Sequence, residues 1–211
     1  MSVPFDKSEV EEYEQKRYRG VDQRIVHTKE ERILRKILRN IGNGTPWVLD
    51  IPCGYGRFSS LLFEKGLRLV SCDLSFHMVN RARERSKVPA NTLGVVADGV
   101  LGLPFKGGVF NLVVSMRFFH HLHKREERRA VLDEFSWITK GWVVLSYYQM
   151  NFLHLLQRKL RRRIKSSRTR IKMISRREFE EEIKESGFKV LRVFPLFRGI
   201  HSHHIALLKK A

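Results

Sequence analysis

The side chains best suited to binding chemistry follow four short apolar runs of the chain. The first group, Asp50–Gly56, contains two glycines, which let the backbone turn tightly and approach a ligand closely. Asp73 follows the second run, Asp98–Gly99 the third, and Ser115–Leu122, with backbone and apolar groups, the fourth. A carboxylate can accept hydrogen bonds from the hydroxyls of a ribose or from the amino group of an adenine. The groups together indicate a site for a ligand that contains adenosine.

Each group has another interpretation when it is taken alone. A dinucleotide-binding loop carries a third glycine where this chain has Ser59, and the Gly-Lys-Ser/Thr of a phosphate-binding P-loop is missing. Asp73 and Asp98 also fit as ordinary turn or helix-capping residues. The argument for a ligand site therefore depends on the groups meeting at one place in the fold.

Strands and helices alternate along the chain in a way that would bring the four groups together. This alternation predicts a single Rossmann-like, doubly wound α/β sheet that is mostly parallel, and such sheets bind ligands at the carboxyl ends of their strands. The expected strands are Trp47–Ile51, Leu67–Asp73, Leu93–Ala97, Val109–Ser115, Gly141–Tyr147, Phe188–Phe194 and His204–Lys209.

Helical patterns are expected over 6–40, 57–65, 75–86, 124–137 and 175–186. Thr28 and Ser175 are each followed three residues later by a glutamate, which is typical of a helix N-terminus. We therefore expect helices to begin after Thr28 and after Ser175. The predicted organisation is an N-terminal helical lid over 1–45, a core over 46–150 and 175–211, and a basic insertion over 151–174.

With all four groups considered together, the chain resembles the class I S-adenosylmethionine-dependent methyltransferases, and more closely their small-molecule type 11 branch. Leu49–Gly56 is similar to the family motif LDxGCGxG, Asp73 to its ribose acid and Asp98 to its adenine-side acid. Phe110–Leu122 resembles the stretch FDxVxxxxxLHHL. The resemblance covers about residues 48–148. It implies S-adenosyl-L-methionine as the cofactor, a methyltransferase activity, and an antiparallel pairing of the last two strands.

The cofactor contacts expected on this basis are Asp50, Pro52, Cys53, Gly54, Gly56, Asp73, Leu74, Met78, Asp98, Gly99, Ser115, Arg117 and Phe118. Two positions depart from the family pattern. Pro52 stands where a glycine is common, and it removes one backbone N–H. Asn111 stands where an aspartate is common, which weakens the case for an acidic catalytic residue there.

Histidines are the candidates for a general base, because imidazole titrates near neutral pH. His120, His121 and His123 are the candidates, and we name His121 and His120 as catalytic; the alternative is that the pair packs under the cofactor or caps a helix. No metal is expected from these histidines, and Cys53 and Cys72 are expected to be reduced, buried thiols. In the resembling family an aromatic or Arg of the N-terminal helix contacts the methionine carboxylate, and Tyr13, Tyr18 and Arg19 are candidates for that contact.

Charge is the unusual feature of the composition, since the formal net charge is +19. Residues 151–177 hold 11 Lys or Arg and no Asp or Glu, and apolar residues at helical spacing make Asn151–Lys165 an expected basic amphipathic helix. The helix could bind a small anionic or lipid-linked acceptor while it contacts an anionic membrane peripherally. Alternatively, it could bind RNA or form a solvated cap. A catalytically inactive basic scaffold is a fourth alternative. A cytoplasmic location is expected, because no signal pattern or membrane-spanning run is present.

Overall fold

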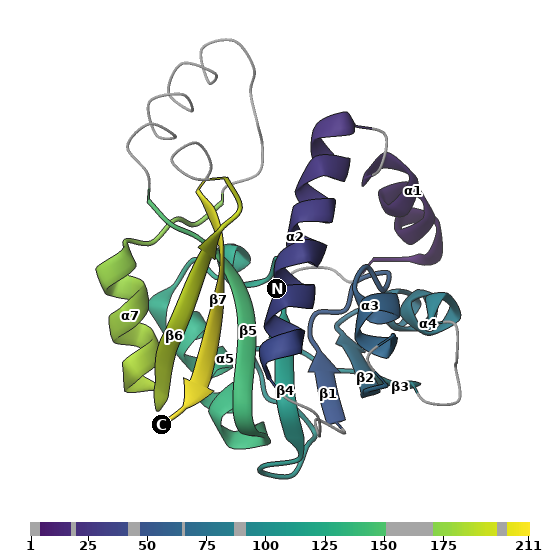
Figure 1. Cartoon of the computed structure of the whole chain (residues 1–211). Coiled ribbons are helices and arrows are strands. Elements are labelled where there is room, and N and C mark those ends of the chain that lie inside the picture. Colours follow the sequence, from purple (N-terminus) through teal and green to yellow (C-terminus); the bar gives the residue numbers. More distant parts are fainter. Residues whose placement is uncertain are drawn as a thin grey trace.

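A seven-stranded sheet forms the centre of the protein (Figure 1). The computed structural model describes residues 5–17, 20–41, 47–64, 66–86, 92–150, 171–197 and 202–211. The strands are β1 (Trp47–Asp50), β2 (Arg68–Asp73), β3 (Thr92–Val96), β4 (Phe110–Ser115), β5 (Thr139–Tyr148), β6 (Phe188–Pro195) and β7 (His203–Lys210). Several sequence-based expectations lie outside the described residues: the basic helix Asn151–Lys165, Tyr18, Arg19 and the side chain of Tyr13.

The strand order is β3-β2-β1-β4-β5-β7-β6. The pairs among β1 to β5 are parallel, whereas β7 is antiparallel to both β5 and β6. The chain reverses its order between β1 and β4, and a crevice forms at the carboxyl ends of the strands at such a switch point. The predicted Rossmann-like, mostly parallel sheet with an antiparallel closing pair is confirmed.

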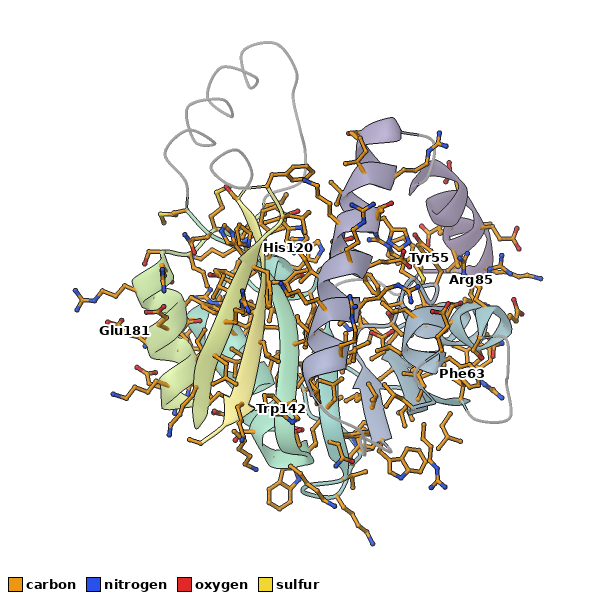
Figure 2. The ribbon with its side chains drawn as sticks, in the orientation of Figure 1. Tyr55, Phe63, Arg85, His120, Trp142 and Glu181 are labelled. Carbon is orange, nitrogen blue, oxygen red and sulfur yellow. The ribbon has the colours of Figure 1, made fainter. Side chains whose placement is uncertain are left out.

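Helices cover both faces of the sheet (Figure 1). Leu34 and Ile37 of α2 (Val21–Asn40) and Leu61 of α3 (Ser59–Phe63) pack with alternate residues of β1, β4 and β5 on one face. On the other face, Phe135 of α5 (Arg125–Ile138) and Phe179 of α7 (Arg176–Glu185) pack in a second cluster. Side chains fill both layers, while the exposed Glu181 lies on the outer side of α7 (Figure 2). Since side chains alternate along a strand, both faces of the central strands are apolar.

The two remaining helices lie at the β2–β3 side of the sheet. α4 (Phe76–Arg85) contacts β2 and β3, and α1 (Lys7–Arg17) contacts α4. None of the helices in the part of the chain that the structure describes is long and apolar enough to cross a membrane.

One of the two predicted helix starts is wrong. α2 runs without a break from Val21 to Asn40, so Thr28 lies in its interior, where its hydroxyl donates a hydrogen bond to the Arg24 carbonyl at 3.0 Å. A threonine within a helix can satisfy its hydroxyl in this way without capping anything. The other start is confirmed: Ser175 Oγ accepts a hydrogen bond from the Glu178 N–H at 3.1 Å, at the N-cap of α7.

Candidate functional site

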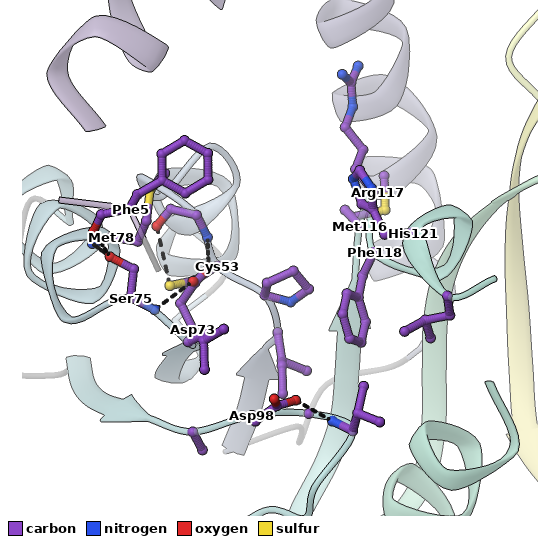
Figure 3. A pocket seen from close by; sticks show the side chains of 18 of the residues that line it. Phe5, Cys53, Asp73, Ser75, Met78, Asp98, Met116, Arg117, Phe118 and His121 are labelled. Carbon is purple, nitrogen blue, oxygen red and sulfur yellow. Dashed lines mark hydrogen bonds between the residues drawn. The ribbon is translucent and has the colours of Figure 1, made fainter. Parts of the chain in front are cut away.

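A cavity of about 720 Å³ opens at the carboxyl ends of β1, β2, β3 and β4. This volume is in the range of pockets that enclose small molecules and cofactors. Phe5, Ser75, Asp73 and Met78 lie on one wall, and Arg117, Phe118 and His121 lie on the opposite wall, with Asp98 between them (Figure 3). The four groups of residues that follow the four strands therefore do meet around one pocket.

Most of the predicted site residues line this pocket. Those that do are Pro52, Cys53, Gly54, Asp73, Leu74, Met78, Asp98, Gly99, Arg117, Phe118 and His121. Asp50, Gly56, Ser115 and His120 are not among its lining residues, and three of these are at most 8% exposed: Asp50, Ser115 and His120. A direct cofactor or catalytic contact by these four residues stays a prediction.

The two glycines of the loop after β1 have different structural roles. Gly54 has a φ of 51°, faces open space, and donates its N–H to Asp73 Oδ2 at 2.9 Å. Gly56 has a φ of 80°, and a Cβ there would lie 2.8 Å from the Cα of Ala82 on α4. Gly54 therefore leaves room in the pocket, while Gly56 lets the loop pack closely against α4.

Asp73 and Asp98 stand at the ends of neighbouring strands. Asp73 Oδ1 accepts a hydrogen bond from the Ser75 N–H at 3.1 Å, and Asp98 Oδ1 accepts one from the Val100 N–H at 2.8 Å. Burial raises the pKa of Asp73 above its ordinary value, although the backbone N–H donors oppose that shift. A carboxylate has about four lone-pair sites, so both side chains keep acceptor capacity for a ligand.

Asp50 lies beneath the loop. It is 1% exposed, and its Oδ2 has no hydrogen-bond partner among the described residues. Burial, with a smaller contribution from the charge of Asp73, raises its pKa to about 8. Burial therefore favours the neutral acid over the carboxylate at this position, because an unpaired buried carboxylate is more costly than the neutral acid.

The two cysteines are free and buried, as expected. Burial is the main cause that raises the pKa of Cys72 to about 12. Both thiols therefore stay protonated at neutral pH.

The N-terminal segment closes one side of the pocket. Phe5 lines the pocket, and its carbonyl accepts a hydrogen bond from Ser75 Oγ at 2.6 Å. Val10 of α1 packs with Tyr55 and Met78 in a small buried cluster. The sequence analysis did not identify Phe5, because nothing in the local pattern relates it to Ser75.

Glu30 and Arg57 are also residues that the sequence analysis missed. Glu30 is fully buried; it accepts hydrogen bonds from Arg117 Nε at 2.8 Å and Nη2 at 3.0 Å, and from Arg57 Nη2 at 2.9 Å. A signal was present, since Glu30 precedes Ile33 and Leu34 at helical spacing and so falls on the apolar face of α2. A charged residue on that face indicates a buried ion pair.

The histidine pair is divided between the pocket and the interior. The His121 ring lies 4.1 Å from the His120 ring, centroid to centroid, and only His121 lines the pocket. The His120 ring lies 4.8 Å from that of Tyr148, and its carbonyl accepts the Lys172 N–H at 3.0 Å. Among the described residues, no group of three His, Cys, Asp or Glu side chains could hold a metal ion. His121 is thus the better placed of the two catalytic candidates.

Comparison with known proteins identifies the core of the chain. Residues 48–141 match the family model described as a methyltransferase domain. This part of the chain is a methyltransferase domain. The sheet and the family match together confirm the prediction of a class I S-adenosylmethionine-dependent enzyme domain, and the type 11 branch fits the match.

Two relatives each match about half of this chain. A tRNA (carboxymethyluridine(34)-5-O)-methyltransferase of Xenopus tropicalis is 32% identical over 47% of this chain and 15% of the relative. A malonyl-acyl-carrier-protein O-methyltransferase of Hamiltonella defensa is 34% identical over 47% of this chain and 36% of the relative. The chain thus spans only about a seventh and about a third of these proteins.

The fold is shared with a solved methyltransferase. The magnesium protoporphyrin IX methyltransferase of Synechocystis PCC 6803, solved with bound SAH, superposes with a TM-score of 0.75. The superposition covers 98% of this chain and 100% of that one, at 18% sequence identity. At this low sequence identity, the likeness shows that the two proteins share a fold.

Proposed function

We propose that the chain binds S-adenosyl-L-methionine in the pocket at the strand ends and transfers the methyl group to a small acceptor. The observation that carries the proposal is the pair of carboxylates, Asp73 and Asp98, on neighbouring strands around one cavity. Asp73 would accept the ribose hydroxyls and Asp98 the adenine amino group. Gly54, with no atom within 4 Å of where a Cβ would be, leaves the space that a close-lying ligand needs.

The residues around this ligand mainly bind and orient. S-adenosyl-L-methionine supplies a methyl group already activated on a sulfonium, so positioning of the acceptor can contribute roughly 7–11 kcal/mol to the lowering of the barrier. Phe5 and Met78 on one wall and Phe118 on the other are apolar, and they would help to exclude water once the ligand is bound. His121 is the residue that could take a proton from a hydroxyl acceptor, a contribution of about 10²–10⁴-fold in rate.

The domain limits predicted from the sequence fit this function. Residues 1–45 would act as a lid, because Phe5 bonds to Ser75 at the pocket. The insertion 151–174 would form a cap on the acceptor side. In support, the last residue of the insertion, Ile174, donates its N–H to the Tyr148 carbonyl at 3.0 Å, and the Lys172 N–H donates to the carbonyl of His120, the neighbour of the pocket residue His121.

The acceptor is proposed to be small and anionic or lipid-linked, and the basic insertion would contact an anionic membrane surface peripherally. The malonyl group named for the Hamiltonella relative is a small acid, which agrees with this class. A second candidate acceptor is RNA, because the net charge is +19 and the Xenopus relative is named for a tRNA. Steep salt dependence of tRNA binding, compared with binding to anionic vesicles, would separate these two proposals.

Calorimetry with S-adenosyl-L-methionine and with its demethylated product tests cofactor binding, on which the proposed function depends. We expect both ligands to bind the full chain with dissociation constants well below millimolar. No detectable heat at millimolar ligand would contradict the proposal. A turnover assay over metabolite, lipid and tRNA fractions would then identify the acceptor by the demethylated product it releases.

A further inference from the structure

Basic and aromatic side chains gather on the last three strands, on the face of the sheet that carries α2. Trp142 of β5 pairs with Lys209 of β7, which pairs in turn with Lys189 of β6. Paired residues of neighbouring strands point to the same face of a sheet, so these three side chains form one row. Trp142 and Phe194 of β6 pack against the cluster that contains Leu34 of α2, and the row therefore lies on the α2 face.

Three aromatic rings in this region each carry a cation. A cation over an aromatic face is attracted to the ring when it lies within about 6 Å of the ring centre. The pairs, with the distance from Lys Nζ or Arg Cζ to the ring centre, are Lys29–Phe197 at 3.6 Å, Arg192–Phe194 at 5.0 Å and Lys209–Trp142 at 5.2 Å. We call these six residues, together with Lys189, the basic strip. The rings hold three of its four charges in place on the sheet.

No acidic side chain offsets the charge of the basic strip. β5, β6 and β7 contain no Asp or Glu. Within the described parts of the chain, none of the four cations forms a salt bridge. The neighbouring acids of α2 are engaged elsewhere, since Glu30 is buried against two arginines and Glu31 faces His27. By contrast, the exposed Arg129 on the other face of the sheet pairs with Glu185. The strip therefore keeps its positive charge for a partner.

α2 borders the basic strip and stands above it. The helix contacts β7, and Lys29 reaches from its flank to Phe197. None of the described helices lies over β6 on this face, whereas α5 and α7 lie behind the sheet (Figure 1). A helix is about 10 Å across, so the strip is recessed beside α2. It follows most of the eight-residue strand β7 and is therefore about 20 Å long.

A single strand of RNA fits the basic strip better than a membrane does. Its phosphates repeat along a narrow line, and its bases can stack on aromatic rings and on guanidinium planes. A flat membrane would meet α2 before it reached the recessed cations. Peripheral binding also requires apolar side chains that insert among the lipids, whereas the rings of the strip are half-buried beneath their cations. A second copy of this chain would be repelled, because the net charge is +19.

We propose that the basic strip binds single-stranded RNA, with its Lys and Arg side chains on the phosphates and the rings of Trp142 and Phe194 against the bases. No residue of the strip is among the residues that line the pocket. The proposal therefore goes beyond the proposed methyl transfer and does not depend on it. The strip is also separate in sequence from residues 151–177, which the sequence analysis singled out for their charge.

Removal of two cations tests the phosphate contacts. The variant Arg192→Gln/Lys209→Gln is compared with Arg129→Gln/Lys184→Gln, which removes the same charge from exposed positions of α5 and α7 on the opposite face. Binding of the full chain to an oligouridine of about 12 nucleotides is measured between about 50 and 200 mM salt.

The expected effect follows from the release of counterions. Each phosphate contact on a single strand contributes about 0.7 to the slope of log K against log salt concentration, so two lost contacts lower the slope by about 1.4. The same two contacts correspond to a roughly 25-fold loss of affinity at about 0.1 M salt. We expect this loss for the strip variant, and binding close to that of the wild type for the variant of the opposite face.

Phe194→Leu tests the contact between the rings and the bases. The variant keeps an apolar side chain on the strip but removes one aromatic ring. We expect oligouridine to bind at least about fivefold more weakly, with the same salt slope as for the wild type. Inorganic polyphosphate carries the charges of a nucleic acid without its bases, so its affinity should be the same for this variant and the wild type.

Several results would overturn the proposal. One is absence of oligouridine binding to the wild type, and another is equal binding by the two double variants when both are folded by circular dichroism. A third is a Phe194→Leu variant that binds RNA as the wild type does, or that loses affinity for RNA and polyphosphate alike. If Arg192→Gln/Lys209→Gln instead loses binding only to vesicles of phosphatidylserine and phosphatidylcholine, the strip is a membrane surface and not an RNA surface. Calorimetry of the same variants with S-adenosyl-L-methionine reports on the proposed methyltransferase function separately.

Discussion

Glu30 Oε1 lies 2.8 Å from Arg117 Nε, although the two residues are 87 positions apart in the chain. The bond joins the middle of α2 to the loop after β4, and Arg57 adds the loop after β1 to the same carboxylate. The buried carboxylate of Glu30 therefore connects α2 to two of the loops that form the pocket. Glu30 helps to hold these two loops in place, although no described residue of α2 lines the pocket.

This connection predicts a large loss of stability when Glu30 is neutralised. Glu30→Gln removes the fully buried carboxylate that faces Arg57 and Arg117, whose side chains are 10% and 20% exposed, and removing one partner of a buried pair costs about 3–5 kcal/mol. We expect the free energy of unfolding, measured by urea denaturation, to fall by about that amount. Glu31→Gln is the matched control, because the Glu31 carboxylate is 32% exposed and lies 3.8 Å from His27. Equal losses for the two variants would show that the buried cluster is not stabilising.

The sequence could predict the cofactor side of the pocket because local patterns determine it. Asp73 ends β2 and Asp98 lies two residues after β3, and parallel strands place their carboxyl ends at one edge of the sheet. The same reasoning could not identify Arg57 as a partner of Glu30, because their contact depends on how α2 packs on the sheet. No periodic pattern contains that long-range information.

The wrong start at Thr28 has a similar cause. A Thr followed by Glu three residues later fits a capping box, but the same residues also fit the interior of a longer helix. α2 begins at Val21, and Val26, which precedes Thr28, packs against the same cluster as Leu34 and Ile37. Packing of a whole helix face outweighs a cap, which contributes only about 1 kcal/mol.

The second prediction concerns Gly56. Gly56→Ala and Gly66→Ala both place a Cβ at positive φ, 80° and 70°, which costs about 1–2 kcal/mol at either position. At Gly66 no atom lies within 4 Å of the new Cβ, whereas at Gly56 it would meet the backbone of Ala82 at 2.8 Å. Overpacking typically adds about 1–3 kcal/mol. We expect thermal melts to show the larger loss for Gly56→Ala, and a smaller loss than for Gly66→Ala would refute the close approach to α4.

The third prediction is a pH dependence caused by Asp50. Its pKa is raised to about 8 by burial, so the folded chain holds a proton that the unfolded chain releases near pH 4. Between these values the folded state binds more protons, and stability must therefore decrease as pH rises, by up to about 1.4 kcal/mol per pH unit. Asp50→Asn stays neutral at every pH. We expect the variant to gain stability over the wild type from pH 5 to pH 8 in urea titrations without ligand. A difference that does not change with pH would contradict a raised pKa.

The last prediction tests the proposed ribose contact of Asp73. Asp73→Asn keeps the size of the side chain but replaces a carboxylate oxygen by an N–H donor, so one acceptor for a ribose hydroxyl is lost. We expect the affinity for the demethylated cofactor to fall by about 10- to 100-fold in calorimetry, which is typical for loss of a hydrogen bond to a charged group. Asp133→Asn, at an exposed pair with Arg129 on α5, should bind as the wild type does.

The 2′-deoxy form of the cofactor completes a double-mutant cycle, because a ligand without the hydroxyl should be less sensitive to the substitution. Additive losses in that cycle would mean that Asp73 does not contact the ribose 2′-hydroxyl, and its carboxylate would then serve to hold the Gly54 and Ser75 N–H groups.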